Sequence, residues 1–379
     1  APILVFLPGI MGSHLNAEGS RVWLDPLGLA RGALSRITMD SPKVSPDGLV
    51  GMAYGKLVER LGKTHEVKLF PYDWRQPIQT LGEQFAEWLA ALLKNHADAP
   101  IHILAHSMGG LVVRAAIAHD PTLWDAIVAR PEGRLVMLGT PNQGAHLFVH
   151  TLLGQSDTIR LLARVDLRHR MQHILDIIAG FPGAIHLLPA PGQADTFDYY
   201  KENTWTDLAA HNNDFWFGSE LGGKPKQAVL DEAKAFWEKV ADTEWVRKAP
   251  DRIAYIYGQS DNTPCGIIKQ KGEGSIVLRG TPAGDGSVTW ASGHLPGLPA
   301  NRSWLMPVDH MGLTSTETHF EEIESLLAHG TPRKLGPLPV SRGGDANVVR
   351  EYRAGPPEGF PSPPEATTRL LGGHLRPEV

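Results

Sequence analysis

The strongest chemical signal in the chain is a serine set between small residues, in the segment Ala105-His-Ser-Met-Gly109. An apolar run beginning at Ile101 precedes it, and apolar residues at helical spacing begin at Leu111. This is the G-x-S-x-G pattern with Ala in the first place, which is typical of a sharp turn from a strand into a helix. Such a turn holds the hydroxyl at the start of a helix, where backbone N–H groups favour negative charge. We therefore expect Ser107 to be a nucleophile; a serine in an ordinary loop is the alternative.

A serine hydroxyl needs a base to take its proton and a carboxylate to orient that base, and the chain offers both. His310 follows the last predicted strand and is the expected base. Asp285, in a turn framed by glycines, is the expected acid, and Asp261, directly after an earlier strand, is the alternative. Ser107, Asp285 and His310 occur in the order nucleophile, acid, base that this type of fold uses.

Acyl transfer also needs two backbone N–H groups directed at the oxyanion. One is expected from Met108, the residue after the nucleophile, and the other from Ile10, in the loop after the first predicted strand. Two glycines let this loop turn back over the sheet edge, and turn geometry alone is the alternative reason for them. We expect His106, beside the serine, to point away from the pocket and serve packing.

The elements that must position these residues alternate between strands and helices. Helices are predicted over residues 54–61, 81–94 and 316–328, where apolar residues recur on one face. This alternation predicts a mostly parallel sheet with helices on both faces. The predicted strands are Ile3–Leu7, Glu66–Phe70, a strand from Ile101 to the serine turn, Arg134–Leu138, Ile253–Tyr257 and Arg302–Pro307, with a hairpin strand at Ser275–Arg279.

The alternation is interrupted once, which divides the chain into four parts. Residues 1–144 and 252–329 are predicted to form one α/β body, and residues 145–251 a helical cap inserted over its carboxyl edge, where sites in such sheets lie. Within the first part, residues 14–50 are expected to be irregular and to be a candidate lid. Residues 330–379 are rich in Gly and Pro and are expected to lie on the body as a tail or to form a linker.

The predicted cap contains two helical stripes and an aromatic cluster. The stripes are Met171 to Ile178 and Val229 to Val240, and the cluster is Asn213-Asp-Phe-Trp-Phe-Gly218. The aromatic side chains would contact an acyl chain or pack the cap onto the body, and packing is the favoured alternative.

Composition excludes several classes of function. The net charge of −5 gives no basic excess for binding nucleic acid. The single cysteine, Cys265, excludes an intrachain disulfide, and no Cys/His cluster has zinc spacing, so neither a metal nor a cofactor is expected. No apolar run reaches the length of a transmembrane segment, and no signal peptide opens the sequence. The compartment stays open between the cytoplasm and secretion after processing.

A set of short motifs, in order over residues 3 to 330, resembles the lecithin:cholesterol acyltransferase-like enzymes, which include lysosomal phospholipase A2. The serine motif also resembles that of small bacterial α/β-hydrolase lipases. The motifs are Pro8-Gly-Ile-Met-Gly-Ser-His-Leu15, Pro71-Tyr-Asp-Trp-Arg75, Ala105-His-Ser-Met-Gly109, Leu138-Gly-Thr-Pro-Asn-Gln-Gly144, Tyr257-Gly-Gln-Ser-Asp-Asn-Thr-Pro264, Gly284-Asp-Gly-Ser-Val288 and His310.

The resemblance implies an α/β-hydrolase fold with a cap, acting on acyl esters of lipids through an acyl-serine. It implies that Ser107, Asp285 and His310 form the catalytic triad, with Ile10 and Met108 as the oxyanion hole, and it places Trp23 in the lid region. Animal members of the family close the lid with a disulfide, which Cys265 has no partner to form.

Together these observations predict a serine carboxylic-ester hydrolase of the lipase, phospholipase or esterase kind, with an acyl-ester or lipid substrate and transient contact with lipid surfaces. An acyltransferase that passes the acyl group to an alcohol is the first alternative, because the triad chemistry is the same. A non-catalytic lipid-binding protein on the same scaffold and a peptidase are further alternatives. Acyl-chain length, head group and oligomeric state do not follow from the sequence.

Overall fold

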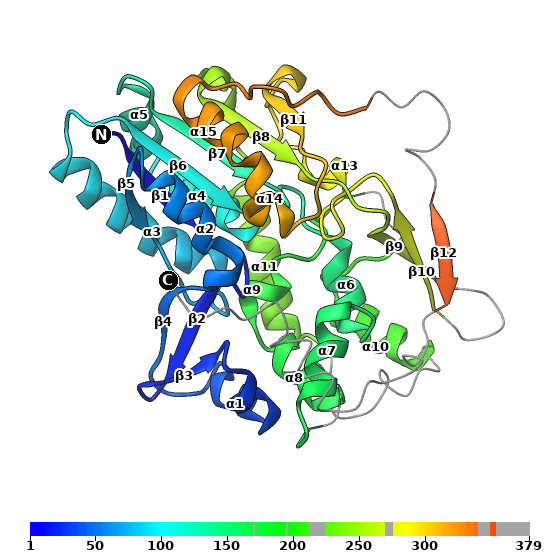
Figure 1. The fold of residues 1–379 in the computed structure, drawn as a ribbon. Coiled ribbons are helices and arrows are strands. Elements are labelled where there is room, and N and C mark those ends of the chain that lie inside the picture. The colour runs from blue at the N-terminus through cyan, green and yellow to red at the C-terminus, as the bar shows by residue number, and fades with distance from the viewer. Residues whose placement is uncertain (170, 194–195, 212–223, 270–275, 340–348, 354–379) are drawn as a thin grey trace.

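Six parallel strands form the central sheet of the protein, in the order β11-β8-β7-β6-β1-β5 (Figure 1). The computed structural model describes residues 1–169, 171–193, 196–211, 224–269, 276–339 and 349–353. All six predicted strands are confirmed. β5 is one residue shorter than predicted, and β11 is three residues shorter. The strands are β1 Ile3–Leu7, β5 Glu66–Leu69, β6 Ile101–His106, β7 Arg134–Leu138, β8 Ile253–Tyr257 and β11 Ser303–Leu305.

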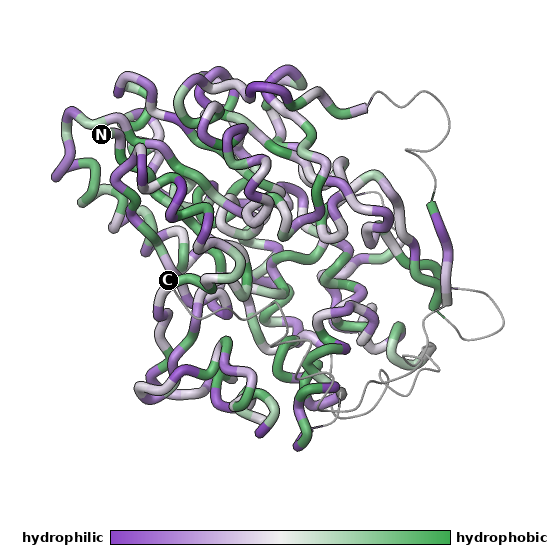
Figure 2. The backbone as a smooth tube through the Cα atoms, viewed as in Figure 1, coloured by the Kyte–Doolittle hydropathy of each residue, from purple (hydrophilic) through white to green (hydrophobic). Residues whose placement is uncertain are grey.

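Successive residues of the central strands enter two separate cores, because side chains alternate across a sheet. In β1, Ile3, Val5 and Leu7 belong to one core, and Leu4 and Phe6 to the other. Strands that are covered on both faces read as continuous apolar runs, which is why their bounds could be predicted. Figure 2 shows these hydrophobic residues along the sheet.

Helices cover both faces of the sheet, as predicted. α2 (Gly51–Leu61) and α15 (Phe320–His329) pack on one face. α3 (Ile78–Asn95), α4 (Met108–His119) and α5 (Thr122–Val128) pack on the other. Because all six strands are parallel, their carboxyl ends share one edge, and the loops that follow them meet there.

Residues 14–50 are not irregular, so that prediction was wrong. They form a small antiparallel sheet in the order β3-β2-β4, and two short helices connect β3 to β4 along the chain. Glu18 (φ 52°) and Gly19 (φ 81°) make a two-residue hairpin turn, in which glutamate replaces the Asn or Asp that usually signals such a turn. The elements are β2 Ser13–Ala17, β3 Ser20–Trp23, β4 Val44–Leu49, α1 Pro26–Ala30 and the 3₁₀ helix η1 Ala33–Ile37.

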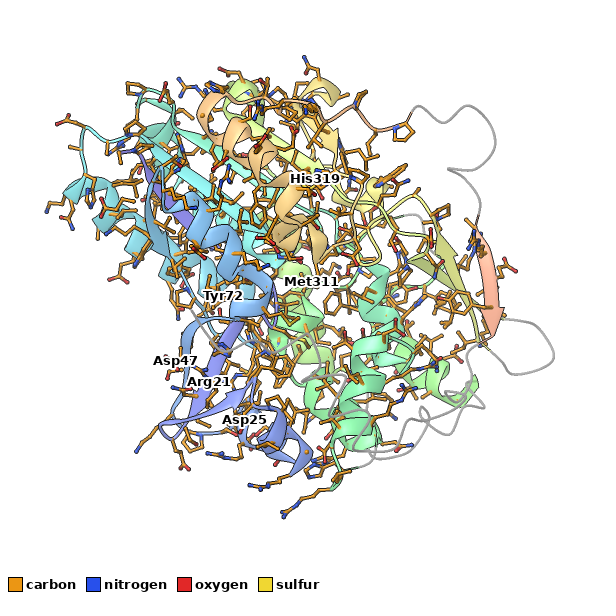
Figure 3. All side chains as sticks on the ribbon, in the orientation of Figure 1. Arg21, Asp25, Asp47, Tyr72, Met311 and His319 are labelled. Atoms are coloured by element: carbon orange, nitrogen blue, oxygen red, sulfur yellow. The ribbon has the colours of Figure 1, made fainter. Side chains whose placement is uncertain are left out.

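An ion pair crosses this small sheet. Arg21 of β3 donates to Asp47 of β4 over 3.0 Å, and both side chains are visible at the edge of the molecule in Figure 3. The pair is half-exposed, so it contributes little to stability. Whether the segment acts as a lid stays a prediction.

Residues 145–251 contain seven helices in the part that the structure describes, and both predicted helical stripes are confirmed, as α8 and α11. The aromatic cluster 213–218 lies outside the described residues. The predicted domain boundaries themselves remain predictions. The helices are α6 His146–Leu152, α7 Asp157–Val165, α8 Met171–Ala179, α9 Pro182–Ile185, α10 Glu202–His211, α11 Gln227–Lys239 and α12 Glu244–Lys248.

A third sheet lies beside α6, in the order β12-β10-β9. Its strands are β9 (Thr263–Lys269), β10 (Ile276–Thr281) and β12 (Arg350–Arg353), so the predicted hairpin strand is confirmed with a shifted start. The Gly/Pro-rich tail contacts the rest of the protein. Its strand β12 pairs with β10, and the carbonyl of its residue Gly336 accepts a hydrogen bond from the N–H of Leu305 in β11. Among the described helices, none is long and apolar enough to cross a membrane.

Candidate active site

Ser107 occupies a strained turn between β6 and α4. Its φ is 53° and its ψ is −127°, a conformation that non-glycine residues rarely adopt. A Cβ on Gly109 would lie 2.6 Å from the carbonyl oxygen of Pro8 and 2.8 Å from that of Leu7. The turn therefore requires glycine two residues after the serine, because β1 and its loop run directly against it.

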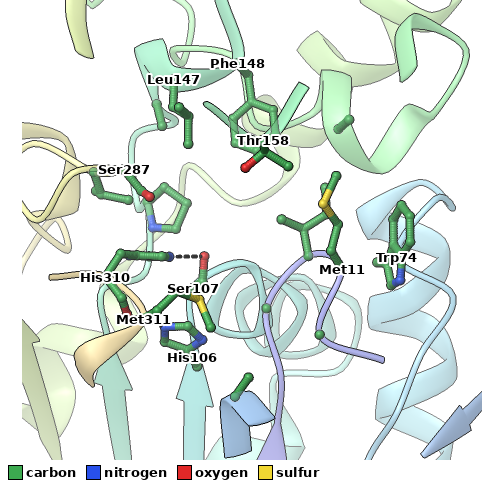
Figure 4. Close-up of a pocket in the computed structure, with 18 of the residues that line it drawn as sticks. Met11, Trp74, His106, Ser107, Leu147, Phe148, Thr158, Ser287, His310 and Met311 are labelled. Carbon is green, nitrogen blue, oxygen red and sulfur yellow. Dashed lines mark hydrogen bonds between the residues drawn. The ribbon is translucent and has the colours of Figure 1, made fainter. Parts of the chain in front are cut away.

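The structure brings Ser107, His310 and Asp285 into one hydrogen-bonded chain, although 203 positions separate the serine from the histidine. The Nε2 atom of His310 lies 2.9 Å from the Oγ atom of Ser107 (Figure 4), and its Nδ1 atom lies 2.7 Å from Oδ2 of Asp285. Asp261, the alternative acid, is exposed at the surface after β8. The geometry thus pairs the histidine with Asp285.

The partners of His310 fix its tautomer. An ionised carboxylate only accepts, so Nδ1–H of His310 donates to Asp285, and the lone pair of Nε2 faces the serine hydroxyl. The other carboxylate oxygen of Asp285 accepts the N–H groups of Ser287 at 2.9 Å and Val288 at 2.7 Å. An imidazole in this tautomer is arranged to take the serine proton.

The pKa values of the pair are shifted in opposite directions. Burial by itself would raise the pKa of Asp285, but the charge of His310 and three hydrogen bonds, from His310, Val288 and Ser287, together hold it below its usual range. Burial by itself would lower the pKa of His310, but the charge and hydrogen bond of Asp285 raise it above its ordinary value. Both shifts favour an imidazolium beside a carboxylate, the state that forms when the serine gives up its proton.

The backbone N–H groups of Ile10 and Met108, the expected oxyanion donors, have no acceptor among the described residues. The N–H of Gly9 is engaged, because it donates to the hydroxyl of Tyr54 over 2.9 Å. A Cβ on Gly9 would lie 2.9 Å from the Cβ of Ser107, so the loop passes as close to the serine as a backbone can. The assignment of Ile10 and Met108 as the oxyanion donors stays a prediction.

A cavity of about 270 Å³ opens beside Ser107. None of its described lining residues is Asp, Glu, Lys or Arg, and Met52 and Met311 are half-exposed at its rim. Figure 4 shows Met11, Trp74, Leu147 and Phe148 around the space above the serine. The apolar lining residues include Ile10, Met11, Trp74, Leu147, Phe148, Ile178, Phe181 and Ala184.

The prediction that His106 points away from the pocket was wrong. Its ring lies among the residues that line the cavity, with its centroid 4.8 Å from that of His310. The loop that carries His310 folds back over the end of β6, and so covers the face on which this side chain lies. Nothing in the sequence signals this contact, because it depends on two segments that are far apart in the chain.

Neither Trp23 nor Cys265 lines the cavity beside Ser107. Trp23, placed in the lid region by the resemblance, is buried; it donates to the Met11 carbonyl over 2.8 Å and packs edge-on against Trp74. It therefore supports the loop that lines the cavity. Cys265 is half-buried in β9, and the described residues contain no cluster of His, Cys, Asp and Glu that would hold a metal.

Comparisons with known proteins agree with this architecture. Residues 45–181 match the model of a family described as a domain of unknown function, DUF7379. No curated protein sequence matches the chain. The structure of a Tle4–Tli4 complex is similar with a TM-score of 0.54 at 13% identity, over 84% of this chain and 96% of that one.

A lipase from Bacillus licheniformis, BlEst2 in its mature form, is similar with a TM-score of 0.42 at 14% identity, over 86% of this chain and 91% of that one. The parallel sheet, the strained serine between strand and helix, and the later acid and histidine together define the architecture. The chain has an α/β-hydrolase fold. At these identities the likeness concerns the fold alone.

Proposed function

We propose that the protein is a serine hydrolase of carboxylic esters with an apolar acyl group. The observation that carries the proposal is the hydrogen-bonded chain Ser107–His310–Asp285 at the floor of an apolar cavity. Nucleophile, base and orienting acid lie within hydrogen-bonding distance of one another, which is the arrangement that activates a serine hydroxyl.

In the proposed reaction, Oγ of Ser107 attacks the ester carbonyl while Nε2 of His310 takes its proton. The carbonyl oxygen becomes an oxyanion, which the N–H groups of Ile10 and Met108 stabilise. Asp285 stabilises the imidazolium. The tetrahedral intermediate then loses the alcohol, which receives the proton from His310, and an acyl-serine remains. Water, deprotonated by the same histidine, then attacks the acyl-serine. The second tetrahedral intermediate breaks its bond to Oγ, which regains the proton from His310, and the carboxylic acid is released.

The cavity supports an acyl chain as the group that is bound. Its lining contains no Asp, Glu, Lys or Arg among the described residues, and burial keeps His106 neutral, so a charged group on the substrate's acyl chain would be desolvated there without an ion-pair partner. An apolar chain loses nothing of this kind and gains roughly 25 cal/mol for each Å² removed from water. We therefore propose a lipid or other long-chain ester as the substrate.

The experiment is a turnover assay with p-nitrophenyl esters of graded chain length, beside phospholipid vesicles and with Ser107→Ala as the control. The proposal expects kcat/KM to rise from the acetate to longer esters, and Ser107→Ala to lose about 10⁴-fold or more of the turnover at unchanged melting temperature. Turnover retained in Ser107→Ala would contradict the proposal.

An acyltransferase is distinguished from a hydrolase in the same assay. With a long-chain alcohol present, a hydrolase releases the free acid, and a transferase forms the ester of the added alcohol. If the protein prefers the shortest soluble esters, its substrate is a small ester and not a lipid, and the proposed triad chemistry is unaffected.

A further inference from the structure

The hydroxyl of Tyr54, on α2, lies between the loop after β1 and the serine turn. It is 2.9 Å from the N–H nitrogen of Gly9 and 2.9 Å from Nδ1 of His106. The other ring nitrogen of His106, Nε2, is 3.0 Å from the carbonyl oxygen of His310. One continuous chain of hydrogen bonds thus joins the backbone beside the candidate oxyanion donor to the backbone of the candidate base.

The direction of each hydrogen bond in this chain follows from its ends. A carbonyl oxygen only accepts, so Nε2–H of His106 donates to His310. A neutral imidazole has one N–H, so Nδ1 of His106 accepts, and the hydroxyl of Tyr54 must donate to it. The Tyr54 oxygen then accepts the N–H of Gly9. Every group in the chain is satisfied in this one arrangement.

Burial keeps the side chains of Tyr54 and His106 neutral, so the arrangement of hydrogen bonds does not change with pH near neutrality. Tyr54 and His106 are 2% and 1% exposed. Burial raises the pKa of Tyr54 and lowers the pKa of His106 to about 3. The ring of Tyr54 packs edge-on against those of Phe6 and His106, which fixes its orientation as well.

The loop after β1 is shaped around the Tyr54 hydroxyl. A Cβ on Gly12 would lie 2.7 Å from that oxygen, and a Cβ on Gly9 would lie 2.9 Å from the Cβ of Ser107. The two glycines of the loop therefore admit the tyrosine on one side and the serine on the other. Turn geometry alone would not need either close approach.

We propose that Tyr54 and His106 are positioning residues, which hold the N–H of Ile10 in place relative to Ser107 and His310. The proposal rests on the proposed function, because Ile10 is the oxyanion donor in it. Gly9 precedes Ile10 directly, so the hydrogen bond of Gly9 to Tyr54 fixes the peptide immediately before the one that carries the N–H of Ile10. The bond from His106 to His310 joins that peptide to the base.

The principal test is Tyr54→Phe, which keeps the ring and removes the hydroxyl. The N–H of Gly9 and Nδ1 of His106 then lose their shared partner, and the loop can shift. A misplacement of about 1 Å in a reacting geometry costs up to about 100-fold in rate. We expect kcat to fall about 10- to 100-fold with KM unchanged, because the variant removes only the hydroxyl and keeps the aromatic ring of Tyr54 in the lining of the apolar cavity.

The matched control is Tyr200→Phe. Tyr200 is also buried, and its hydroxyl donates to the carbonyl of Pro189 over 2.9 Å, outside the cavity lining. Tyr54→Phe loses two buried hydrogen bonds, and Tyr200→Phe loses the bonds of its hydroxyl to the carbonyls of Leu188 and Pro189. Both variants should therefore lose stability, about 1 kcal/mol for each bond. Only Tyr54→Phe is expected to lose kcat. Equal kcat in the two variants would overturn the inference.

A second pair of variants decides the question if Tyr54→Phe does not fold. His106→Phe keeps a ring and loses both hydrogen bonds, whereas His106→Asn places an amide oxygen near the position of Nδ1 and can still accept from Tyr54. We expect kcat of the Asn variant to exceed that of the Phe variant about tenfold. Equal rates would overturn the inference, while activity in Ser107→Ala would overturn the proposed function instead.

Discussion

The strand β6 carries a buried histidine near each end, and only one of them belongs to the candidate site. His102 and His106 lie four residues apart on the same face, and each is 1% exposed. Burial lowers the pKa of the first to about 4 and of the second to about 3. Each also contacts another histidine. A ring nitrogen of His102 lies 3.0 Å from a ring nitrogen of His65, and Nε2 of His106 lies 3.0 Å from the carbonyl oxygen of His310.

The surroundings of the two histidines differ. At the amino end, His102 and His65 lie beside Thr64, and neither histidine lines the cavity that holds Ser107. At the carboxyl end, the loops that follow several parallel strands converge on His106. Residue type, burial and a shifted pKa are therefore the same at both ends. The convergence of loops at the carboxyl edge is what distinguishes the site.

The largest expected loss of activity is that of Asp285→Asn, a variant at the carboxyl end of the sheet. An amide in place of the carboxylate no longer holds the tautomer of His310 or stabilises its imidazolium, and we expect kcat to fall about 10⁴-fold. Asp261→Asn is the control, because Asp261 is the exposed alternative acid and should leave kcat unchanged. Equal effects of the two variants would contradict the assignment of the acid.

The pH profile gives the same pair of variants a second readout. His310 must be neutral to act as base, so kcat/KM is lost as pH falls through its pKa. Because Asp285 raises that pKa above 6.5, the acid limb of the wild-type profile should have its midpoint above 6.5. In Asp285→Asn the midpoint of the residual activity should move down, since burial then acts without the opposing charge. An unmoved midpoint would contradict this account.

At the amino end, His102→Ala is expected to change stability and not activity. The substitution removes a buried ring and its hydrogen bond to His65, and should lower the free energy of unfolding by about 1–3 kcal/mol. Urea unfolding and ester turnover below the transition measure the two quantities. A loss of kcat that matched the loss seen on changing His106 would break the comparison between the two ends.

The smallest effect per residue is shared by both ends and concerns acid stability. The buried histidines at positions 102, 106, 150 and 186 have pKa values of about 3 to 4 in the folded state, against 6.5 ordinarily. They stay neutral in the folded protein and gain protons on unfolding, so stability is present above pH 6.5 and falls as pH drops. His310 has the opposite shift, and its contribution is lost as pH rises above 6.5.

Urea unfolding between about pH 6.5 and pH 5.5 reports mainly on the buried histidines, because unfolded carboxylates, with pKa values of about 3.9 to 4.3, are still more than about 90% ionised there. Each buried neutral histidine should add roughly 1 kcal/mol per pH unit to the slope. His102→Ala should flatten the slope by one such contribution. A free energy of unfolding that did not change over this range would contradict the neutral state of these residues.

The central sheet and the three residues of the hydrogen-bonded chain could be predicted because their signals are local. Buried parallel strands are continuous apolar runs, and the serine turn requires small residues at fixed positions. The small sheet of residues 14–50 was missed because its hairpin turn uses Glu18-Gly19, which carries little sequence signal. The bonds of Tyr54 and His106 were missed because they form between residues 52 and 204 positions apart.

The central claim is that Ser107 is activated by His310, and labelling with a fluorophosphonate probe tests it most directly. Mass spectrometry of the digested protein should find the adduct on the peptide that contains Ser107, and His310→Ala should abolish the labelling while the melting temperature stays unchanged. An adduct on another residue, or the same labelling rate without His310, would contradict the account.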